Sequence, residues 1–259
     1  MINVNKLLEL NASGYTQKEM AKLLKVSRST VQRTLRRYHI KTPNYHNAVK
    51  FDNCVFDIID TEEKAYWLGF LYADGAVGLL NNNVELSLAI KDISHLEKFK
   101  NFIKSPKDIN ISTVIVGGKC FKRCRLTVTD KHFKTQLIKC GCHPKKSFTI
   151  TFPDENIVPK QLIAHFIRGY VDGDGCISFC NVKDLKISII GTIEFLTSIR
   201  AIYPNIFSEC KKDKRWKGNT YYICAHCSKA NKILTNLYKN SNIYLQRKYN
   251  RLAVLSSNW

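Results

Sequence analysis

One short pattern occurs twice in this chain and constrains its fold more than any other feature of the sequence. The first copy, Trp67–Gly75, reads WLGFLYADG, and the second copy, Ile167–Gly175, reads IRGYVDGDG. Both copies end in Asp-Gly, and the two aspartates, Asp74 and Asp174, lie 100 residues apart. This spacing is the length of a small structural unit, so the sequence predicts two copies of one unit.

Small residues recur four positions apart in each copy and predict close packing of two helices. These residues are Gly69 and Ala73 in the first copy and Gly169 and Gly173 in the second. Positions four apart share one helix face, and a stripe of small residues lets two helix backbones approach closely. Gly75 and Gly175, which follow the aspartates, suit a left-handed turn that ends each helix.

Side-by-side packing of the two helices would bring Asp74 and Asp174 together at the helix C-termini. Two such carboxylates repel each other and face the negative ends of both helix dipoles, so they require bound divalent cations. The alternative is two unrelated core helices with ordinary Asp-Gly turns. Duplication at this spacing favours a shared site.

The two copies resemble the paired signature helices of the LAGLIDADG homing endonucleases in their two-motif, single-chain form. The similarity extends over residues 60–259: Asp92 and Thr192, the expected N-caps of a later helix, each follow their aspartate by 18 residues. The resemblance implies a site-specific double-strand DNA endonuclease involved in intron homing. It also implies that two sheets form a saddle over the duplex and that the cut leaves short 3′ overhangs.

The resemblance also implies the chemistry of the site. Asp74 and Asp174, with Gly75 and Gly175 beside them, would hold Mg²⁺, for which Mn²⁺ is a possible substitute. Lys146 and Lys248 follow the two aspartates by 72 and 74 residues and resemble the family's basic residues near the cut. They would neutralise charge in the transition state or order the attacking water.

The two copies differ at two positions. The first copy has Tyr72 where the second has Asp172, and the second has Arg168 where the first has Leu68. Neither position is one that the family uses for metal. The differences predict that the two halves are not equivalent.

The chain from residue 60 onwards predicts an α+β fold of two pseudo-symmetric αββαββα repeats, residues 60–158 and 159–259. Residues 84–90 alternate apolar and polar side chains, which is typical of a half-buried antiparallel strand. A later hairpin in each repeat is densely basic, and such a ribbon can enter the major groove of DNA. The basic residues are Lys119, Lys122, Arg123 and Arg125 in the first repeat and Lys211, Lys212, Lys214, Arg215 and Lys217 in the second. Any single one of them could instead lie on a solvated face.

Residues 1–42 predict a small all-α helix-turn-helix module, which residues 43–59 link to the repeats. A capping box at residues 16–19 opens one helix with Met20, Ala21, Leu23 and Leu24 facing inward. Ser27 is the expected N-cap of a second helix, and the outward residues suit base edges and phosphates. These outward residues are Arg28, Ser29, Gln32, Arg33 and Arg36. The alternative is a helical hairpin with a solvated basic face.

Charge indicates the partner independently of the motifs. The chain has 41 Lys and Arg against 21 Asp and Glu, a formal net charge of +20. Such a charge attracts polyanions and predicts salt-dependent binding of double-stranded DNA, although a basic surface can also serve solubility. No apolar run reaches the ~20 residues needed to span a bilayer. The chain starts without a secretory signal, so we expect an intracellular protein that binds no membrane. The resemblance implies a monomer with no obligate protein partner.

Ten cysteines raise the question of a zinc site. The candidate clusters are Cys140, Cys142 and His143, and Cys224, His226 and Cys227 with Cys210 upstream. A structural zinc site usually needs two closely spaced ligand pairs, and neither cluster has a second pair at the familiar separation. We therefore expect reduced and mostly buried thiols.

Two other functions stay open from the sequence. A DNA-binding regulator could keep the saddle without cleaving, but the presence of both Asp74 and Asp174 argues against it. An RNA splicing maturase could use the same fold. The helix-turn-helix argues against that function, because such helices read B-form grooves.

Overall fold

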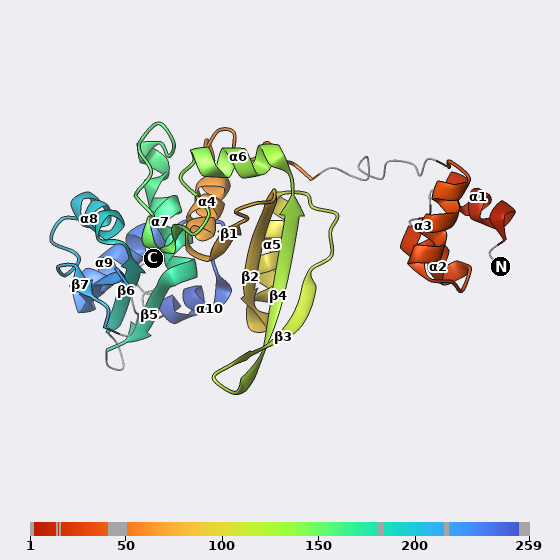
Figure 1. Cartoon of the computed structure of the whole chain (residues 1–259). Coiled ribbons are helices and arrows are strands. Elements are labelled where there is room, and N and C mark those ends of the chain that lie inside the picture. The colour runs from red at the N-terminus through yellow and green to blue at the C-terminus, as the bar shows by residue number, and fades with distance from the viewer. Residues whose placement is uncertain are drawn as a thin grey trace. The chain divides into compact units, whose positions relative to one another are not determined.

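The computed structural model describes residues 3–13, 15, 17–40, 51–180, 184–214 and 218–253. The chain forms two compact units, Met1–Lys50 and Phe51–Trp259 (Figure 1). Several positions singled out in the sequence lie outside the described residues. They are Thr16 of the expected capping box, residues 43–50 of the expected linker, Arg215 and Lys217.

The N-terminal unit consists of helices α1 (Val4–Ala12), α2 (Gln17–Leu23) and α3 (Arg28–Arg37). The helices α2 and α3 agree with the predicted helix-turn-helix, whereas the sequence analysis missed α1. Leu7 of α1, Met20 of α2 and Val31 of α3 are all fully buried and form the centre of a small core. The expectation for Leu23 was wrong: it is the last residue of α2, and its side chain is 56% exposed.

The larger unit contains the two predicted αββαββα repeats. The first repeat consists of α4 (Glu62–Asp74), β1 (Gly75–Val77), β2 (Asn83–Ala89), α5 (Ile93–Phe102), β3 (Asn110–Val116), β4 (Lys119–Thr129) and α6 (Lys131–Lys139). The second consists of α7 (Ile163–Asp174), β5 (Gly175–Phe179), β6 (Leu185–Gly191), α8 (Ile193–Ile202), β7 (Lys211–Lys212), β8 (Tyr221–His226) and α9 (Cys227–Tyr238). The short helix α10 (Gln246–Tyr249) follows. None of the helices that the structure describes is long and apolar enough to cross a membrane.

Each repeat has a four-stranded antiparallel sheet, in the orders β1-β2-β4-β3 and β5-β6-β8-β7. Apolar and polar side chains alternate along the central strands, and this alternation decides which face of each sheet is buried. In the first sheet Leu86 pairs with Leu126, and both side chains are buried. In the second sheet Ile189 pairs with Ile223 in the same way. The intervening residues of β2, β4, β6 and β8 therefore face away from the core.

The helices α4 and α7 pack side by side between the two sheets (Figure 1). A Cβ atom added to Gly69 would overlap the carbonyl oxygen of Phe166, and one added to Gly169 would overlap that of Tyr66. One added to Gly173 would overlap the Cβ of Ala73. The small-residue stripe therefore allows the backbone contact that the sequence predicted.

The prediction of left-handed turns at Gly75 and Gly175 was wrong. Gly75 has φ −72° and Gly175 has φ −82°, and both lie in the extended region, where each residue begins a strand. Glycine is needed there because the preceding helical turn leaves no room for a Cβ atom. A Cβ atom at either position would lie 2.5 Å from the carbonyl oxygen four residues earlier, in Leu71 or Val171.

Residues 51–59 belong to the larger unit, although the sequence analysis assigned them to the linker. Val55, Phe56 and Ile59 are buried and join the core that both repeats share. Phe56 packs its ring 5.6 Å from the ring of Phe133 in α6. The assignment of residues 51–59 to the linker expected at residues 43–59 was therefore wrong.

Candidate active site and nucleic-acid interface

Asp74 and Asp174 are the last residues of α4 and α7. Because the two helices pack closely, these residues lie at one centre: a Cβ atom added to Gly173 would lie 3.3 Å from Asp74 Oδ2. Both aspartates keep solvent-exposed surface. The centre is thus open to a substrate from outside.

The carboxylates are nevertheless in an environment that disfavours their charge. Partial loss of water, together with the charge of Asp174, raises the pKa of Asp74 from 3.8 to about 6. Loss of water also raises the pKa of Asp174, while the charges of Lys146 and Lys248 oppose the increase. Cations near the two carboxylates would stabilise their ionised forms.

Lys146 and Lys248 are buried, and each ammonium group binds the C-terminus of the helix in its own half. Lys248 Nζ shares its three N–H groups among four carbonyl oxygens: those of Val171 and Asp172, both at 2.7 Å, and those of Gly173 and Gly175. Lys146 Nζ donates to the carbonyl oxygens of Ala73 and Gly75. Positive charge at the negative end of a helix dipole is favourable. The lysines therefore cap the two helices that carry the aspartates.

The donor set at this centre fits a hard divalent cation. Carboxylate oxygens are the ligands that Mg²⁺ prefers, and like charges close together favour its binding. Gly75 and Gly175 accept hydrogen bonds from the lysines, so each carbonyl oxygen has one lone pair left for another partner. Asp74 and Asp174 are therefore the residues best able to hold such an ion.

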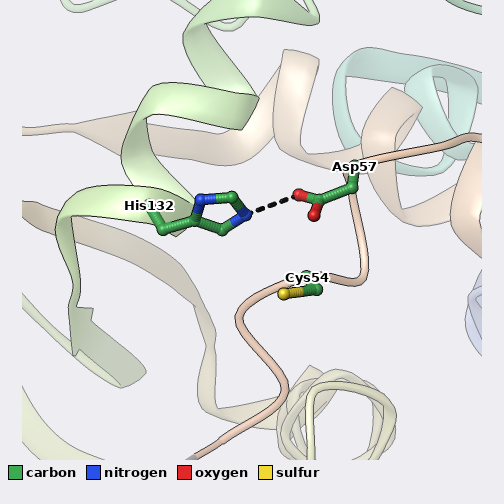
Figure 2. A group of neighbouring side chains, drawn as sticks. All are labelled: Cys54, Asp57 and His132. Carbon is green, nitrogen blue, oxygen red and sulfur yellow. Dashed lines mark hydrogen bonds and ion pairs between the residues drawn. The ribbon is translucent and has the colours of Figure 1, made fainter.

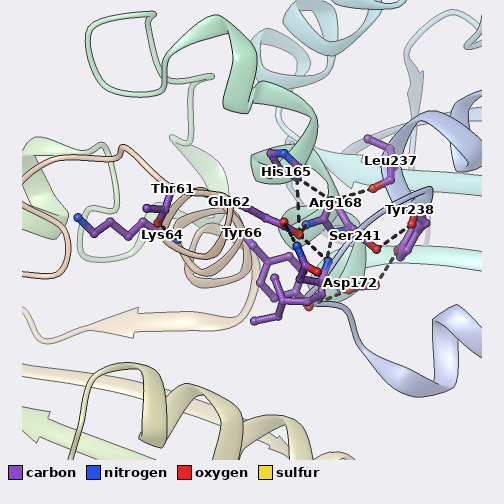
Figure 3. A network of polar contacts seen from close by, with 12 residues as sticks. Thr61, Glu62, Lys64, Tyr66, His165, Arg168, Asp172, Leu237, Tyr238 and Ser241 are labelled. Carbon is purple, nitrogen blue, oxygen red and sulfur yellow. Dashed lines mark hydrogen bonds and ion pairs between the residues drawn. The ribbon is translucent and has the colours of Figure 1, made fainter.

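Arg168, which has no counterpart in the first half, joins the two helices to the chain before Lys248 (Figure 3). Its guanidinium is 1% exposed and donates to Glu62 Oε1 of α4 at 2.7 Å and to the carbonyl oxygen of Ile243 at 2.9 Å. Glu62 also accepts the backbone N–H of Asn242 at 2.9 Å. Burial of this ion pair is offset by hydrogen bonds that satisfy both partners.

Asp172 is the second departure between the copies, and it is the centre of a buried network (Figure 3). Its Oδ1 accepts from the Tyr238 hydroxyl and its Oδ2 from the Tyr66 hydroxyl and the backbone N–H of Leu245, each at 2.7 Å. Tyr66 also contacts His95 Nε2 at 2.9 Å. Arg168 and Asp172, at which the second copy differs from the first, therefore both bind the segment that leads to Lys248.

The two expected N-caps differ. Thr192 caps α8, since its side chain accepts the N–H of Phe195. Asp92 precedes α5 but makes no such bond; its carboxylate accepts from Arg247 Nε, with both oxygens at 2.9 Å. An ion pair between the two repeats has replaced the cap.

Strand alternation divides the basic residues of the first hairpin between the two faces of the sheet. Arg123 and Arg125 lie on the face opposite the core, where Arg125 is 3.5 Å from Glu85 and Arg123 donates to Ser112 Oγ. Lys119 is an even number of residues from both arginines, so it lies on the same face of the sheet as they do. Lys122 is two residues from the buried Cys124, so it lies on the other face, the one that carries the core.

The second sheet forms a hollow of about 880 Å³ over its face opposite the core. Three of the lysines that the sequence analysis proposed for DNA binding line it: Lys211, Lys212 and Lys214. Lys186 and Tyr222 line it too, and the sequence analysis missed both. Alternation along residues 185–191 could have identified Lys186, because Lys186 lies between the buried Leu185 and Ile187.

All five outward residues predicted on α3 are exposed: Arg28, Ser29, Gln32, Arg33 and Arg36. Ser27 caps the helix by accepting the N–H of Thr30 at 3.1 Å. The hydroxyl of Ser29 lies 2.7 Å from that of Ser27. Ser29 thus contributes to the cap as well as to the exposed face.

The expectation of mostly buried thiols was wrong, although all ten cysteines are free. Only Cys124, Cys140 and Cys142 are buried, and Cys140 and Cys142 donate to the backbone carbonyls of Phe56 and Leu71. Within the described parts of the chain, neither candidate zinc cluster brings three ligand atoms together. A group that the sequence analysis missed does so at the surface: the ligand atoms of Cys54, Asp57 and His132 lie within 4.8 Å of one another (Figure 2). There His132 Nε2 is 2.7 Å from Asp57 Oδ1.

Comparisons with known proteins agree with both units. Residues 6–42 match the family described as homeodomain-like domain, while no curated protein matches the chain. The homing endonuclease I-WcaI, solved bound to its DNA recognition sequence, is 15% identical; the match covers 75% of this chain and 88% of that one, with a TM-score of 0.56. The LAGLIDADG homing endonuclease I-GzeII, solved in complex with its DNA target, is 14% identical, with coverages of 74% and 88% and a TM-score of 0.51.

Proposed function

We propose that this chain, whose larger unit has the fold of the LAGLIDADG homing endonucleases, is a site-specific double-strand DNA endonuclease. The observation that carries the proposal is the meeting of Asp74 and Asp174 at the ends of two closely packed helices. A fold that only bound DNA would have no need of two repelling carboxylates at its centre. This argument also favours cleavage over a purely regulatory role.

Asp74 and Asp174 would hold Mg²⁺, with Mn²⁺ as a possible substitute. Bound there, the ion would supply Lewis-acid polarisation of the scissile phosphate and a lower pKa for a bound water. The raised pKa values of the two carboxyls support this assignment. Loss of water raises both values, the charge of Asp174 adds to the increase at Asp74, and a divalent cation would stabilise the ionised forms that burial disfavours.

The two lysines contribute charge and rigidity to the same centre. Their ammonium groups lower the pKa values of the carboxyls and thus favour the ionised forms that bind metal. Burial lowers the pKa of Lys248 to about 8, so the ammonium remains mostly protonated at neutral pH. Positive charge held beside the scissile phosphate would stabilise the additional negative charge of the transition state.

The DNA would lie across the two exposed sheet faces. Arg123 and Arg125 on one sheet and Lys186 and Lys211 on the other provide contacts to phosphates or base edges. I-WcaI and I-GzeII were both solved with their DNA targets, which supports duplex DNA as the partner. The helix α3, with its exposed arginines, would bind a further stretch of the duplex. Both repeats lie on one chain, so a monomer suffices.

Selection from a randomised DNA library tests the proposal. The full chain is incubated with the library in Mg²⁺, and molecules cut on both strands are sequenced. We expect a single enriched site, cleavage that EDTA abolishes, and no enrichment with a variant carrying both Asp74→Asn and Asp174→Asn. A folded chain that binds DNA but cuts no member of the library would contradict the proposal and favour a regulator.

A further inference from the structure

The residue two positions before each aspartate differs between the halves, yet it contacts the same kind of segment in both. Tyr72 donates its hydroxyl hydrogen to the carbonyl oxygen of Cys140, in the segment that leads to Lys146. Asp172 accepts the N–H of Leu245, in the segment that leads to Lys248. We propose that Tyr72 and Asp172 are positioning residues, each of which holds the lysine of its own half beside its aspartate. The link to cleavage rests on the proposed function.

Asp172 fixes the start of the helix that carries Lys248. Leu245 is the N-cap residue of α10, and its N–H is 2.7 Å from Asp172 Oδ2. Lys248 Nζ donates back to the carbonyl oxygen of Asp172, also at 2.7 Å. Asp172 is 1% exposed, and the hydroxyls of Tyr66 and Tyr238 hold the carboxylate in place. The side chain of Asp172 thus binds Leu245, its carbonyl oxygen binds Lys248, and these two residues are the ends of a four-residue stretch.

Tyr72 performs the corresponding task in the first half with a different group. The residue is 2% exposed, and its hydroxyl fits against Gly141, where an added Cβ atom would overlap the hydroxyl oxygen. The Cys142 thiol donates to the carbonyl oxygen of Leu71 at 3.5 Å, next to Tyr72 on α4. The chain before Lys146 is thereby attached to α4 by two adjacent contacts.

The two attachments have opposite hydrogen-bond polarity. Tyr72 donates to a carbonyl oxygen, whereas Asp172 accepts from an N–H. A carboxylate at position 72 would face a carbonyl oxygen with no donor between them, and an unpaired buried charge is costly. The halves are therefore not interchangeable at this position, even though both positions serve their lysines.

Hydrogen–deuterium exchange of the full chain without DNA tests the attachment itself. We expect Asp172→Asn to increase exchange at residues 242–250 with little change at residues 140–148, and Tyr72→Phe to show the reverse. Tyr170→Phe is the matched control, since it removes a buried hydroxyl that donates to Ile190, outside both segments. Asparagine lacks the charge and one of the two acceptor oxygens that bind Leu245, Tyr66 and Tyr238, so the attachment should weaken. It keeps the shape and one acceptor oxygen of the side chain, so this variant should fold even if Asp172→Ala does not.

A cleavage assay that follows each DNA strand separately tests whether these attachments affect the reaction. In a pseudo-symmetric site each half lies nearest one DNA strand, so a displaced lysine should slow one strand selectively. We expect Asp172→Asn and Tyr72→Phe to slow opposite strands by about 10- to 100-fold, while Tyr170→Phe slows neither selectively. Equal slowing of both strands by each variant, or exchange that rises equally in both segments, would overturn the proposal. If the wild-type chain does not cleave, the exchange measurement still decides the attachment, and only the proposed function fails.

Discussion

Gly169→Ala should destabilise the larger unit, although alanine is the better helix former. In a helix interior, alanine in place of glycine gains about 1 kcal/mol. At this position the new Cβ atom would overlap the carbonyl oxygen of Tyr66 and lie 2.9 Å from the N atom of Phe70. Both atoms are backbone and cannot rotate away, so the overpacking cost should be at the upper end of its usual range, about 3 kcal/mol. The net loss is about 2 kcal/mol, or a decrease in Tm of about 4–8 °C.

Denaturant unfolding followed by tryptophan fluorescence measures this loss, because all three tryptophans are in the larger unit. Glu97, exposed in the middle of α5, supplies the control for intrinsic propensity. We expect Glu97→Ala to be about 1 kcal/mol more stable than Glu97→Gly. If Gly169→Ala shows a similar gain over the wild type, the helices are not in backbone contact and the reasoning is refuted.

Two further predictions follow from charge. In EDTA, Asp74→Asn should be about 1 kcal/mol more stable than the wild type at pH 7, with most of this difference absent at pH 4. The pKa of Asp74 is higher in the folded state, so ionisation costs stability as pH rises from 3.8 to about 6. Solvent at this exposed residue reduces the effect. Urea titrations at both pH values check the sign, and a variant less stable at pH 7 would contradict it. Arg123→Ala should weaken DNA binding and make its salt dependence shallower, whereas Lys122→Ala, on the opposite face, should change neither. Equal effects in binding titrations at several salt concentrations would show that alternation does not select the DNA-facing residues.

Local and repeated patterns allowed the sequence to predict the helix pair, the two repeats and the meeting of Asp74 and Asp174. Four-residue spacing reports directly on a helix face, and alternation reports directly on a sheet face. The missed helix α1 has a weaker pattern, since only Leu7 and Leu10 of its apolar residues are buried. Its N-cap, Asn3, is a single residue without the glutamate of a capping box.

Contacts between distant residues were beyond prediction from the sequence. Nothing near Asp92 indicates that its carboxylate binds Arg247 instead of capping α5. Similarly, the role of Lys248 as a cap on α7 depends on four carbonyl oxygens more than 70 residues earlier in the chain. The positions of Gly75 and Gly175 show the same limit, because space beside the preceding helical turn, and not backbone angle, requires glycine there.

Cleavage by the two aspartate variants tests the shared centre most directly. Asp74→Asn and Asp174→Asn are each assayed with the DNA site selected by the wild-type chain, in Mg²⁺ and at saturating DNA. Each variant loses one carboxylate of the centre while keeping the basic sheet faces. We predict no double-strand cleavage by either variant, with DNA affinity close to that of the wild type. Full double-strand cleavage by either one would contradict a centre built from both aspartates.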